Sequence, residues 1–576
     1  MAAAELPDRW FLDDEIDPRH PVYTRASIDE LLPRPLSPLG HTLLWQPGLR
    51  QGWRDAALTF MGFGPDEIDA DRPEVMIVAG GYPYLSLSIV REFARRAPGL
   101  TPARVDAAYF GAAAASFPPI VDPAVPDEVS VVGHRLGWVL DATDLPELRV
   151  DREEADATRS GRPDLATFDD ADVIARARRL VPACRRMFDR HVMITVASSI
   201  GLGALVALGE RLGDPSLGRR LVAGFRSTDA DSPSWALWDL SRAVRASPEL
   251  TAELDAGTAG LLARLRASES GDVAAFLDGL ADIVRRHGSR GPNDWELATA
   301  TWESDPTILL AAIDRLRLVA DDASPARRQE RLAADRAAVL AEVEAALDDE
   351  GRAELHRALR SAAVCIPARV QTNTTLVKLI GEVRHAVMEL GRRLVDRGQL
   401  EHISDITLVT DDELDACVAD PAAFAAIIEE RRGQLERLAS LEPPPVIDGS
   451  VPPLPTWPTH ASLAGTAAPG LVLTGTGTAP GVAEGRARVI ADPAHPEALE
   501  LGDVLVTDTV GPAWMPLVAT AGAVIVDLGS TDGPAGLVAR GLGVPCVVGV
   551  SGATTSLDDG VRVRVDGTAG TVTVLD

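Results

Sequence analysis

The stretch Asp527-Leu-Gly-Ser-Thr-Asp-Gly-Pro-Ala-Gly-Leu-Val-Ala-Arg540 decides the fold of the C-terminal part of this sequence. An apolar, strand-like run, Ala523–Val526, precedes it, and a short helix is predicted over Ala535–Leu542. A loop between a strand and a helix leaves backbone N–H groups free at the positive end of the helix dipole. The loop Gly529–Pro534 is therefore either an anion-binding site or a simple capped turn. The candidate anion-binding residues are Ser530, Thr531, Asp532 and Gly533.

Further apolar runs alternate with glycine-rich turns on both sides of this loop. They are Gly502–Thr507, Cys546–Val550, Val561–Val565 and Thr571–Leu575. Short strands that alternate with short helical segments are typical of an α/β domain. We therefore predict a small α/β domain over residues 471–576.

Five motifs in this region resemble one known family. In order, they are Thr478-Ala-Pro-Gly-Val-Ala-Glu-Gly-Arg-Ala-Arg-Val489, Gly502-Asp-Val-Leu-Val506, Gly511-Pro-Ala-Trp-Met-Pro-Leu517, Ala539-Arg-Gly-Leu-Gly-Val-Pro545 and Asp566-Gly-Thr-Ala-Gly-Thr-Val572. Together they resemble the phosphohistidine swivelling domain of the PEP-utilising enzymes, which include phosphoenolpyruvate (PEP) synthase, pyruvate phosphate dikinase and rifampin phosphotransferase. That family carries its phosphoryl group on a histidine just before the helix, after a serine.

The carrier histidine of the family is replaced in this sequence. Aligned through Val538-Ala539-Arg540, the family's serine falls on Gly533 and its histidine on Pro534. No histidine follows His495. Proline has no nucleophilic side chain, and neither Ser530 nor Asp532 has a candidate base nearby in the sequence. We therefore expect a degenerate phosphohistidine site.

The rest of the chain is predicted to be mainly helical. From Asp169 to about Ala439, apolar residues recur at spacings of three and four. The predicted helices include Val173–Arg190, Val192–Leu212, Gly351–Ile366 and Leu376–Arg397. The predicted fold is multidomain: a large, mainly α-helical (α+β) domain and a small α/β domain of the swivelling type. The predicted boundaries are a lead-in at 1–22, the helical domain at 23–440, a Pro-rich linker at 441–470 and the swivelling domain at 471–576.

Composition restricts the possible functions. The formal net charge is −29, which argues against binding to nucleic acid or to an anionic membrane. Lys378 is the only lysine, so it is the only residue able to form a Schiff base. The four cysteines are scattered and suggest neither a zinc site nor disulfides, and the N-terminus does not read as a signal peptide. We expect a soluble cytoplasmic protein.

Several segments of the helical domain resemble the antibiotic-binding middle domain of rifampin phosphotransferase. They include Tyr23-Thr-Arg-Ala-Ser-Ile-Asp-Glu-Leu-Leu-Pro-Arg-Pro-Leu-Ser-Pro-Leu39, Val75–Ser88, the loop His287–Pro306 and, further along, Arg384 and Asp405–Leu414. In the loop, Arg290, Asp294, Glu296, Trp302 and Pro306 correspond to the family's pattern. The resemblance implies that the substrate pocket includes Arg25, Ser37, His41, Trp295 and Trp302.

The loop also contains the candidate catalytic residues. Arg290, Asp294 and Glu296 lie within seven residues of one another, and a desolvated carboxylate can serve as a general acid or base. Asp294 and Glu296 are the preferred candidates. The alternative is a cluster of surface salt bridges. Acidic pairs elsewhere lack the further carboxylates that a metal site requires, so no metal is expected.

The first hypothesis is an enzyme of specialised metabolism that binds a bulky, partly apolar molecule between the two domains and converts it by acid–base or anion-stabilised chemistry. The second is a phosphotransferase component that works with a separate ATP-binding protein. The third is a non-catalytic, ligand-binding pseudoenzyme. No ATP-grasp domain and no PEP-binding barrel are recognised, so ATP and PEP are not expected to bind this chain alone, and the cofactor is unknown. The expected partners are a small-molecule substrate and, in the second hypothesis, the ATP-binding protein.

Overall fold

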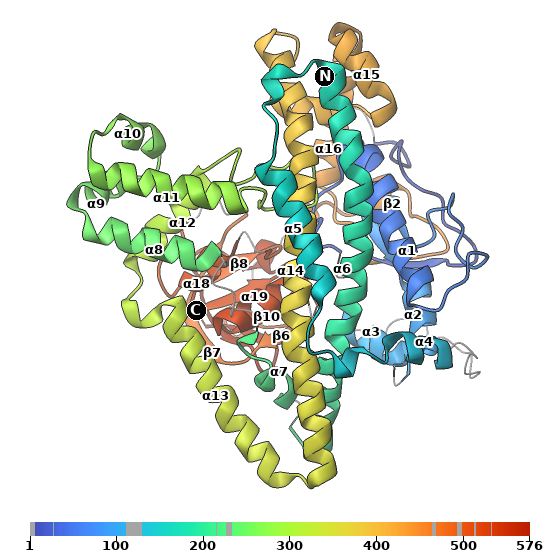
Figure 1. Ribbon diagram of the computed structural model, residues 1–576, viewed down its shortest axis with the longest axis vertical. Helices are drawn as coiled ribbons and strands as arrows, with labels where there is room; N and C mark the ends of the chain where they lie inside the picture. Colours follow the sequence, from blue (N-terminus) through green and yellow to red (C-terminus); the bar gives the residue numbers. More distant parts are fainter. Residues whose placement is uncertain are drawn as a thin grey trace. The chain divides into compact units, whose positions relative to one another are not determined.

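The chain divides into two compact units, each described separately below. The computed structural model describes residues 6–26, 28–98, 100–110, 129–214, 216–225, 233–463, 468–491, 498–511, 514–530 and 533–575. Unit 1 comprises Met1–Ser198, Trp295–Thr299 and Ala368–Ala464. Unit 2 comprises Ser199–Asp294, Ala300–Pro367 and Gly465–Asp576. Two long helices, α6 (Asp170–Leu212) and α14 (Asp349–Asp396), contribute residues to both units (Figure 1).

Unit 1 combines a small sheet with helices. Its helices are the π-helix η1 (Gly40–Arg50), α1 (Gln51–Thr59), α2 (Leu87–Arg96), α3 (Pro102–Phe110), α4 (Val129–Leu136), η3 (Val139–Asp141), α5 (Pro146–Ser160), η4 (Leu165–Thr167), η7 (Ile403–Leu408), α15 (Asp411–Ala419), α16 (Pro421–Ala439), η8 (Leu454–Thr456) and α17 (His460–Leu463). Its strands are β1 (Val22–Thr24), β2 (Met76–Ala79), β3 (Tyr82–Ser86) and β4 (Val446–Asp448). They form an antiparallel sheet in the order β2-β3-β1-β4.

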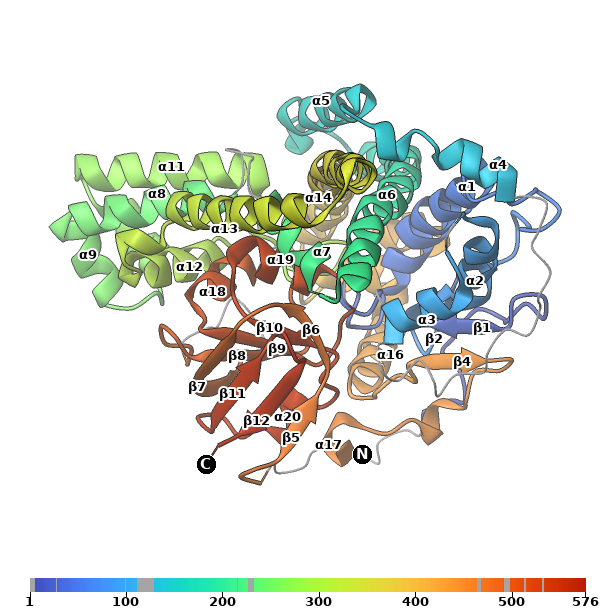
Figure 2. The ribbon, with the colours of Figure 1, turned by 90° about the horizontal axis from the view of Figure 1, so that it is seen from below.

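Within unit 1, the first part of α6 and the last part of α14 run side by side in opposite directions (Figures 1 and 2). Asp170 binds Arg393 at one end of this pair, and His191 hydrogen-bonds Thr372 further along. The predicted helix breaks near residues 191 and 367–375 are absent from this part of the structure, although Pro182 and Pro367 lie inside the helices. Thr374 and Thr375 donate to the carbonyls one turn earlier, so they satisfy their hydroxyls without ending the helix.

The Pro-rich stretch predicted as a linker belongs to unit 1 over its described residues up to Leu463. Strand β4 pairs with β1, with Tyr23 opposite Ile447, and Leu454 and Trp457 are buried. The prolines therefore shape an extended but packed segment rather than a free tether. Proline composition alone did not reveal the apolar residues that hold this segment in place.

Unit 2 contains a group of helices and a larger sheet. Its helices are α7 (Leu217–Leu221), α8 (Pro233–Ala246), α9 (Pro248–Asp255), α10 (Leu261–Ala267), α11 (Gly271–His287), α12 (Thr307–Leu318), η6 (Asp321–Ala323), α13 (Pro325–Ala346), α18 (Met515–Thr520), α19 (Pro534–Leu542) and α20 (Ala553–Ser556). Its strands are β5 (Val472–Thr474), β6 (Thr476–Ala479), β7 (Val482–Val489), β8 (Val504–Thr507), β9 (Ala523–Val526), β10 (Cys546–Val548), β11 (Arg562–Asp566) and β12 (Thr571–Val574).

The strands of unit 2 form one sheet in the order β5-β12-β11-β7-β8-β9-β10-β6. Its centre, β7-β8-β9-β10, is parallel, and the flanking pairs are antiparallel. Leu505 and Val524 face one apolar cluster with residues of α18 and α19, whereas Val504 and Ile525 face a second cluster. Both faces are covered, which explains the continuous apolar runs. The predicted strands and the α/β class are confirmed, and the helix predicted over Ala535–Leu542 is observed as α19, Pro534–Leu542.

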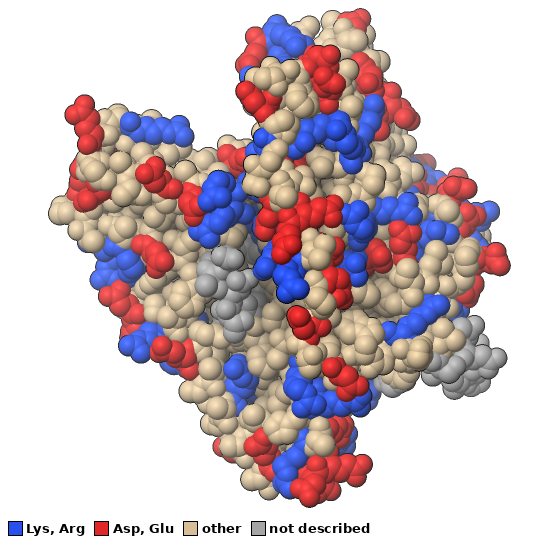
Figure 3. Space-filling view, in the orientation of Figure 1, with Lys and Arg blue, Asp and Glu red and all other residues tan. Residues whose placement is uncertain are grey.

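The surface is mixed in charge. Figure 3 shows Lys and Arg side chains interspersed with Asp and Glu across the described part of that face. Helix α6 includes an 18-residue window with a mean hydropathy of 2.0, of which 44% is buried. By length and composition alone α6 could cross a membrane, but a single such helix is weak support because core helices pass the same test. A cytoplasmic location stays a prediction.

Two helical glycines offer a test of the packing in this fold. A Cβ atom on Gly391 of α14 would lie 2.1 Å from the Ile403 carbonyl oxygen, so the backbones must move apart to accept it. Gly391→Ala is expected to destabilise the protein by about 1–3 kcal/mol, as overpacked sites do. Gly203→Ala on α6, where a Cβ meets nothing within 4 Å, is the matched control and is expected to be neutral or slightly stabilising. Urea unfolding of both variants measures the difference, and an equal effect would contradict the packing described here.

Candidate functional site

The carboxylate of Glu296 forms the centre of a buried polar site in unit 1. Glu296 is 6% exposed, and its Oε1 accepts a 2.6 Å hydrogen bond from the Ser37 hydroxyl. Backbone N–H groups of Ser37 and Ala298 donate to the same carboxylate at 3.4 and 3.0 Å. The Ser37 hydroxyl in turn accepts from the Gly40 N–H at 3.1 Å. Two residues predicted from separate motifs are thus in direct contact.

The surroundings hold this carboxylate in one position. Arg384 of α14 donates from Nε and Nη2 to the Glu296 carbonyl oxygen, at 3.1 and 2.7 Å. A Cβ on Gly40 would lie within 2.9 Å of both Glu296 carboxylate oxygens, so a larger residue at this position would displace the carboxylate. Arg384 therefore holds the backbone of Glu296, and the start of the π-helix lies against its carboxylate.

Burial changes the acidity of Glu296. Its pKa is raised above the usual range of a glutamate, because desolvation disfavours the charged form. The hydrogen bonds from Ser37 and Ala298 and the charge of Arg384 oppose this rise. A carboxyl group with a raised pKa can hold and release a proton closer to neutral pH, as a general acid or base must.

His41 lies one turn after Ser37, at the start of the π-helix. It is 4% exposed, and neither ring nitrogen has a hydrogen-bond partner among the described residues. Burial, with a smaller contribution from the charge of Arg50, lowers the pKa of His41 to about 3. The ring lies 6.4 Å from that of Trp10. His41 is therefore a neutral imidazole, and π-helical turns of this kind are often found at functional sites.

Trp295 belongs to a second group of buried side chains in unit 1. Its indole Nε1 donates to the Asn373 side chain at 3.1 Å, and its ring meets Phe188 edge-on at 5.2 Å between centroids. The His191 ring lies 6.1 Å from Trp295, and its Nδ1 is 3.0 Å from the Thr372 hydroxyl. Burial also lowers the pKa of His191 to about 3. Trp295 is thus a packing residue that connects Glu296 to the α6–α14 pair.

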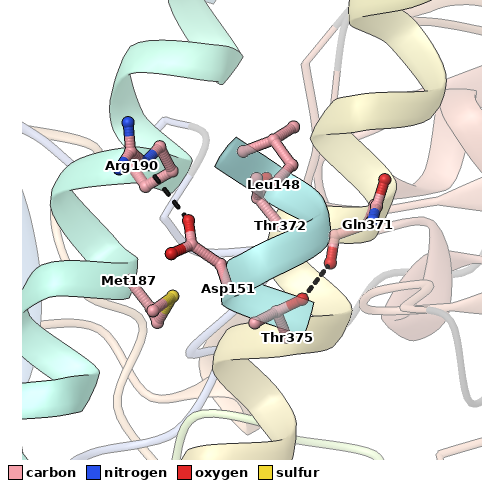
Figure 4. Close-up of a pocket in the computed structure, with 7 residues that line it drawn as sticks. All are labelled: Leu148, Asp151, Met187, Arg190, Gln371, Thr372 and Thr375. Atoms are coloured by element: carbon pink, nitrogen blue, oxygen red, sulfur yellow. Dashed lines mark hydrogen bonds and ion pairs between the residues drawn. The ribbon is translucent and has the colours of Figure 1, made fainter. Parts of the chain in front are cut away.

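A small hollow lies beside Thr372, between three helices (Figure 4). It is lined by Leu148 and Asp151 of α5, Met187 and Arg190 of α6, and Gln371, Thr372 and Thr375 of α14. Arg190 Nε lies 3.3 Å from Asp151 Oδ2, and burial raises the pKa of Asp151. Almost none of the space in the hollow is wide enough for a water molecule, whereas pockets for drug-sized ligands span roughly 300–1,000 Å³. It is too small for the bulky substrate that we expected.

The other half of the predicted catalytic loop lies in unit 2. Arg290 Nη1 donates to Asp294 Oδ2 at 2.8 Å, and the Gly291 N–H donates to Asp294 Oδ1 at 2.7 Å. The Arg290 carbonyl accepts from the Trp302 N–H. Trp302 is 1% exposed and packs in the helical core of unit 2. Asp294 is therefore neutralised by a loop-closing ion pair, which leaves Glu296 as the stronger acid–base candidate.

The Arg25 side chain is held by backbone carbonyl groups and aromatic rings of unit 1. Its guanidinium donates to the carbonyls of Pro83 and Leu32, both at 2.9 Å, and lies over the rings of Tyr82 and Tyr84. Arg25 is buried at 4% exposure. Its role in substrate binding stays a prediction.

The loop before α19 is described only in part, because Thr531 and Asp532 lie outside the described residues. Gly529 adopts a φ of 139°, which favours glycine, and Ser530 is buried. Gly533 is the N-cap residue of α19, and Pro534 is its first residue. Proline suits this position because its missing N–H would have no partner inside the helix.

Four residues around the site were not predicted to contribute to it: Gly40, Thr372, Asn373 and Arg384. One signal could have revealed two of them. The run Gln371-Thr-Asn-Thr-Thr375 places five consecutive polar residues inside a long helix, and Thr372 and Thr375 are buried. Buried polar residues need partners, so such a run indicates a polar interface. Across the described residues, no group of His, Cys, Asp and Glu could hold a metal ion.

Two family models match the chain. The model of the rifampicin phosphotransferase fourth domain matches residues 190–369, and that of the PEP-utilising enzyme mobile domain matches residues 499–570. Over these two segments the chain is similar to rifampicin phosphotransferase and to the PEP-utilising enzymes. The segment of this chain that matches the mobile domain, residues 499–570, contains no histidine.

Individual proteins extend this relationship. An uncharacterised protein of Mycobacterium tuberculosis is 28% identical over 98% of this chain and 62% of its own length. The prodigiosin synthesizing transferase of Serratia marcescens is 28% identical over 62% of this chain and 40% of its own length. A rifampicin phosphotransferase of Streptomyces sviceus is 26% identical over 64% of this chain and 42% of its own length. The chain thus spans less than two thirds of the length of each of these relatives.

Proposed function

We propose that this chain binds a bulky, partly apolar small molecule and converts it by acid–base chemistry at Glu296, without a phosphoryl relay through its mobile domain. The observation that carries the proposal is the Glu296–Ser37 pair. A buried carboxyl group with a raised pKa, held 2.6 Å from a hydroxyl group, is a combination found in functional sites more often than in ordinary cores.

The absence of a relay rests on the sequence of the matched domain. A phosphohistidine requires a histidine, and residues 499–570 contain none. The position where we expected the carrier is Pro534, the first residue of α19. The mobile domain then has a role other than carrying phosphate on histidine.

The substrate class rests on the relatives. Two of them are named for small molecules, one as a prodigiosin synthesizing transferase and one as a rifampicin phosphotransferase. Each matches more than three fifths of this chain. A small molecule of specialised metabolism is therefore the substrate class that we propose, and Ser37 and His41 are the polar groups that we assign to its binding.

Intact-protein mass tests the absence of the relay. The chain is incubated with Mg-ATP and, separately, with PEP, each with and without lysate of the source organism. No adduct with the mass of a phosphoryl group is expected under any of these conditions, because the matched domain has no carrier histidine. A stable adduct would instead support the phosphotransferase component that works with a separate ATP-binding protein.

A further inference from the structure

The residues of the candidate site in unit 1 are closed off from solvent. Ser37, His41 and Glu296 are all buried, with only 3–6% of their surface exposed. A group that acts on a substrate has to meet it, and enzymes with closed sites admit their substrates through the movement of a loop or lid. A segment that covers these residues must therefore move if the site is to be used.

One segment that packs against the site has no regular secondary structure. Residues 6–14, which we call the strap, contain neither helix nor strand. Trp10 of the strap is buried, and its ring lies 6.4 Å from the ring of His41, tilted by 57°. The backbone N–H of His41 donates to the Ser37 carbonyl oxygen at 2.8 Å. The Trp10 indole therefore packs on the helical turn that carries both Ser37 and His41.

The contact between Trp10 and His41 leaves polar atoms without partners. Trp10 Nε1 and both ring nitrogens of His41 are buried and have no hydrogen-bond partner among the described residues. Burial of a polar atom without a partner is costly, because the atom has lost its hydrogen bonds to water. The closed position of the strap is thus opposed by polar groups that water or a polar ligand would satisfy in an open position.

Two aspartates attach the strap to the small sheet of unit 1. Asp13 accepts hydrogen bonds from the N–H groups of Gly81 and Trp10, at 3.1 and 2.9 Å. Asp14 accepts from the Val78 N–H and donates its own N–H to the Val78 carbonyl oxygen, both at 2.8 Å. Burial raises the pKa of Asp13 to about 6, because desolvation disfavours its charged form. The Asp13 attachment is therefore made at the cost of burying a carboxylate, and irregular segments held in this way open locally.

We propose that the strap is a lid over the candidate site and that Trp10 is its autoinhibitory plug. In the closed position the indole blocks the approach to His41. In the open position the strap releases its bonds to Gly81 and Val78, and the substrate takes the place of the indole. This inference rests on the proposed function, because the lid serves the same site. The strap lies outside both segments matched by the family models.

Diethyl pyrocarbonate, which modifies neutral imidazoles, measures the opening of the strap in the full chain at pH 7. His191 is the internal control, because burial lowers its pKa and that of His41 alike, to about 3, and because it hydrogen-bonds Thr372 between two long helices. Peptide mass spectrometry follows both rates. Local opening is expected to let His41 react about tenfold or more faster than His191.

The dependence on urea distinguishes local opening from global unfolding. Below the unfolding transition, the modification rate of His41 is expected to stay constant, whereas that of His191 is expected to rise with the urea concentration, because global unfolding exposes far more surface. Equal rates that both rise with urea would overturn the proposal, since His41 would then become accessible only when the whole protein unfolds.

A pair of variants tests the attachment of the strap. Asp13→Asn has one acceptor oxygen in place of two, so it is expected to raise the rate at which His41 is modified about fivefold, with no change at His191. The matched control is Asp8→Asn, which removes the same charge from an exposed position of the same strap and is expected to change the rate less than about twofold. Equal increases in the two variants, or an increase that His191 shares, would contradict the lid.

Substrate depletion separates the lid from the chemistry of the site. Where the wild type depletes a compound of a metabolite extract, Asp13→Asn is expected to deplete it about fivefold faster at low substrate concentration, in proportion to the faster modification of His41. An unchanged depletion rate together with faster modification would overturn the autoinhibitory role of Trp10. If no compound is depleted while His41 still reacts through local opening, the proposed acid–base function fails and the lid stands.

Discussion

Replacing Glu296 with glutamine is expected to reduce substrate conversion about a hundredfold or more while the chain stays folded. Glutamine keeps the shape and the acceptor oxygen for Ser37, but it cannot gain or lose a proton. General acid–base catalysis contributes typically 10²–10⁴-fold, which sets the expected size. The measurement is untargeted mass spectrometry of metabolite extracts incubated with each variant, which gives the initial rate at which a substrate peak declines.

Glu401→Gln is the matched control, because Glu401 has a side chain 73% exposed in the same unit. It should convert substrate at the wild-type rate. If Glu296→Gln is as active as the wild type, Glu296 serves only to anchor its loop to Ser37. If neither the wild type nor the variants deplete any compound, the non-catalytic alternative is favoured.

Glu296→Gln also has a readout that does not depend on activity. A carboxyl group whose pKa is raised on folding stabilises the protein at low pH and loses that contribution as the pH rises through its folded pKa. Glutamine has no such dependence. The variant should therefore gain stability relative to the wild type as the pH rises above the usual range of a glutamate, which urea midpoints across that range can measure.

Removing the buried imidazole of His41 is expected to protect the protein against acid. The pKa of His41 is lowered to about 3, so the unfolded chain binds a proton below pH 6.5 that the folded chain does not. The neutral His41 ring therefore does not reduce the free energy of unfolding above pH 6.5. Below pH 6.5 that free energy falls as the pH drops toward 3. His41→Leu should match the wild type at pH 7.5 and exceed it at pH 5 by about 2 kcal/mol, at about 1.4 kcal/mol per pH unit.

The comparison between variant and wild type is essential here. Burial raises the pKa values of Asp13, Asp29 and Asp189 to about 6, and these carboxyl groups stabilise the folded chain as the pH falls. Their contributions cancel in the difference between the two proteins. The control is His134→Leu, which removes an exposed imidazole. A constant offset between His41→Leu and the wild type from pH 7.5 to 5 would contradict the pKa shift.

The sequence predicted local structure well where one pattern dominated. The alternation of apolar runs with glycine turns placed β8, β9, β10, β11 and β12 within a few residues, because both faces of that sheet are buried. The apolar periodicity predicted helix ends at positions where the long helices continue. It divided α14 near Pro367, since a proline and a run of polar residues read as a stop, whereas side-chain hydrogen bonds allow the helix to continue.

The candidate site was predictable as a set of residues but not as an arrangement. The resemblance supplied Ser37 and Glu296 from motifs far apart in the sequence, and the structure places them in contact. It also joined Asp294 with Glu296 on grounds of spacing, whereas Asp294 closes its own ion pair with Arg290. Two residues of separation say nothing about which partner each carboxylate meets. Partner choice depends on tertiary contacts such as those from Gly40 and Arg384.

Strand β4 also has a consequence for the order of folding. The Thr24 hydroxyl binds the carbonyl of Pro445, 421 residues later, and β1 completes its sheet only by pairing with β4. At synthesis rates of about 5–20 residues per second, β1 waits roughly 20–85 s for this partner to leave the ribosome. During that interval one edge of the sheet stays open, and open edges invite pairing with other chains. Slower synthesis of the α7–α13 region, which lies between β1 and β4 in the sequence, should therefore lower the yield of folded protein more than equally slower synthesis of the residues that follow β4, because only the former prolongs this wait.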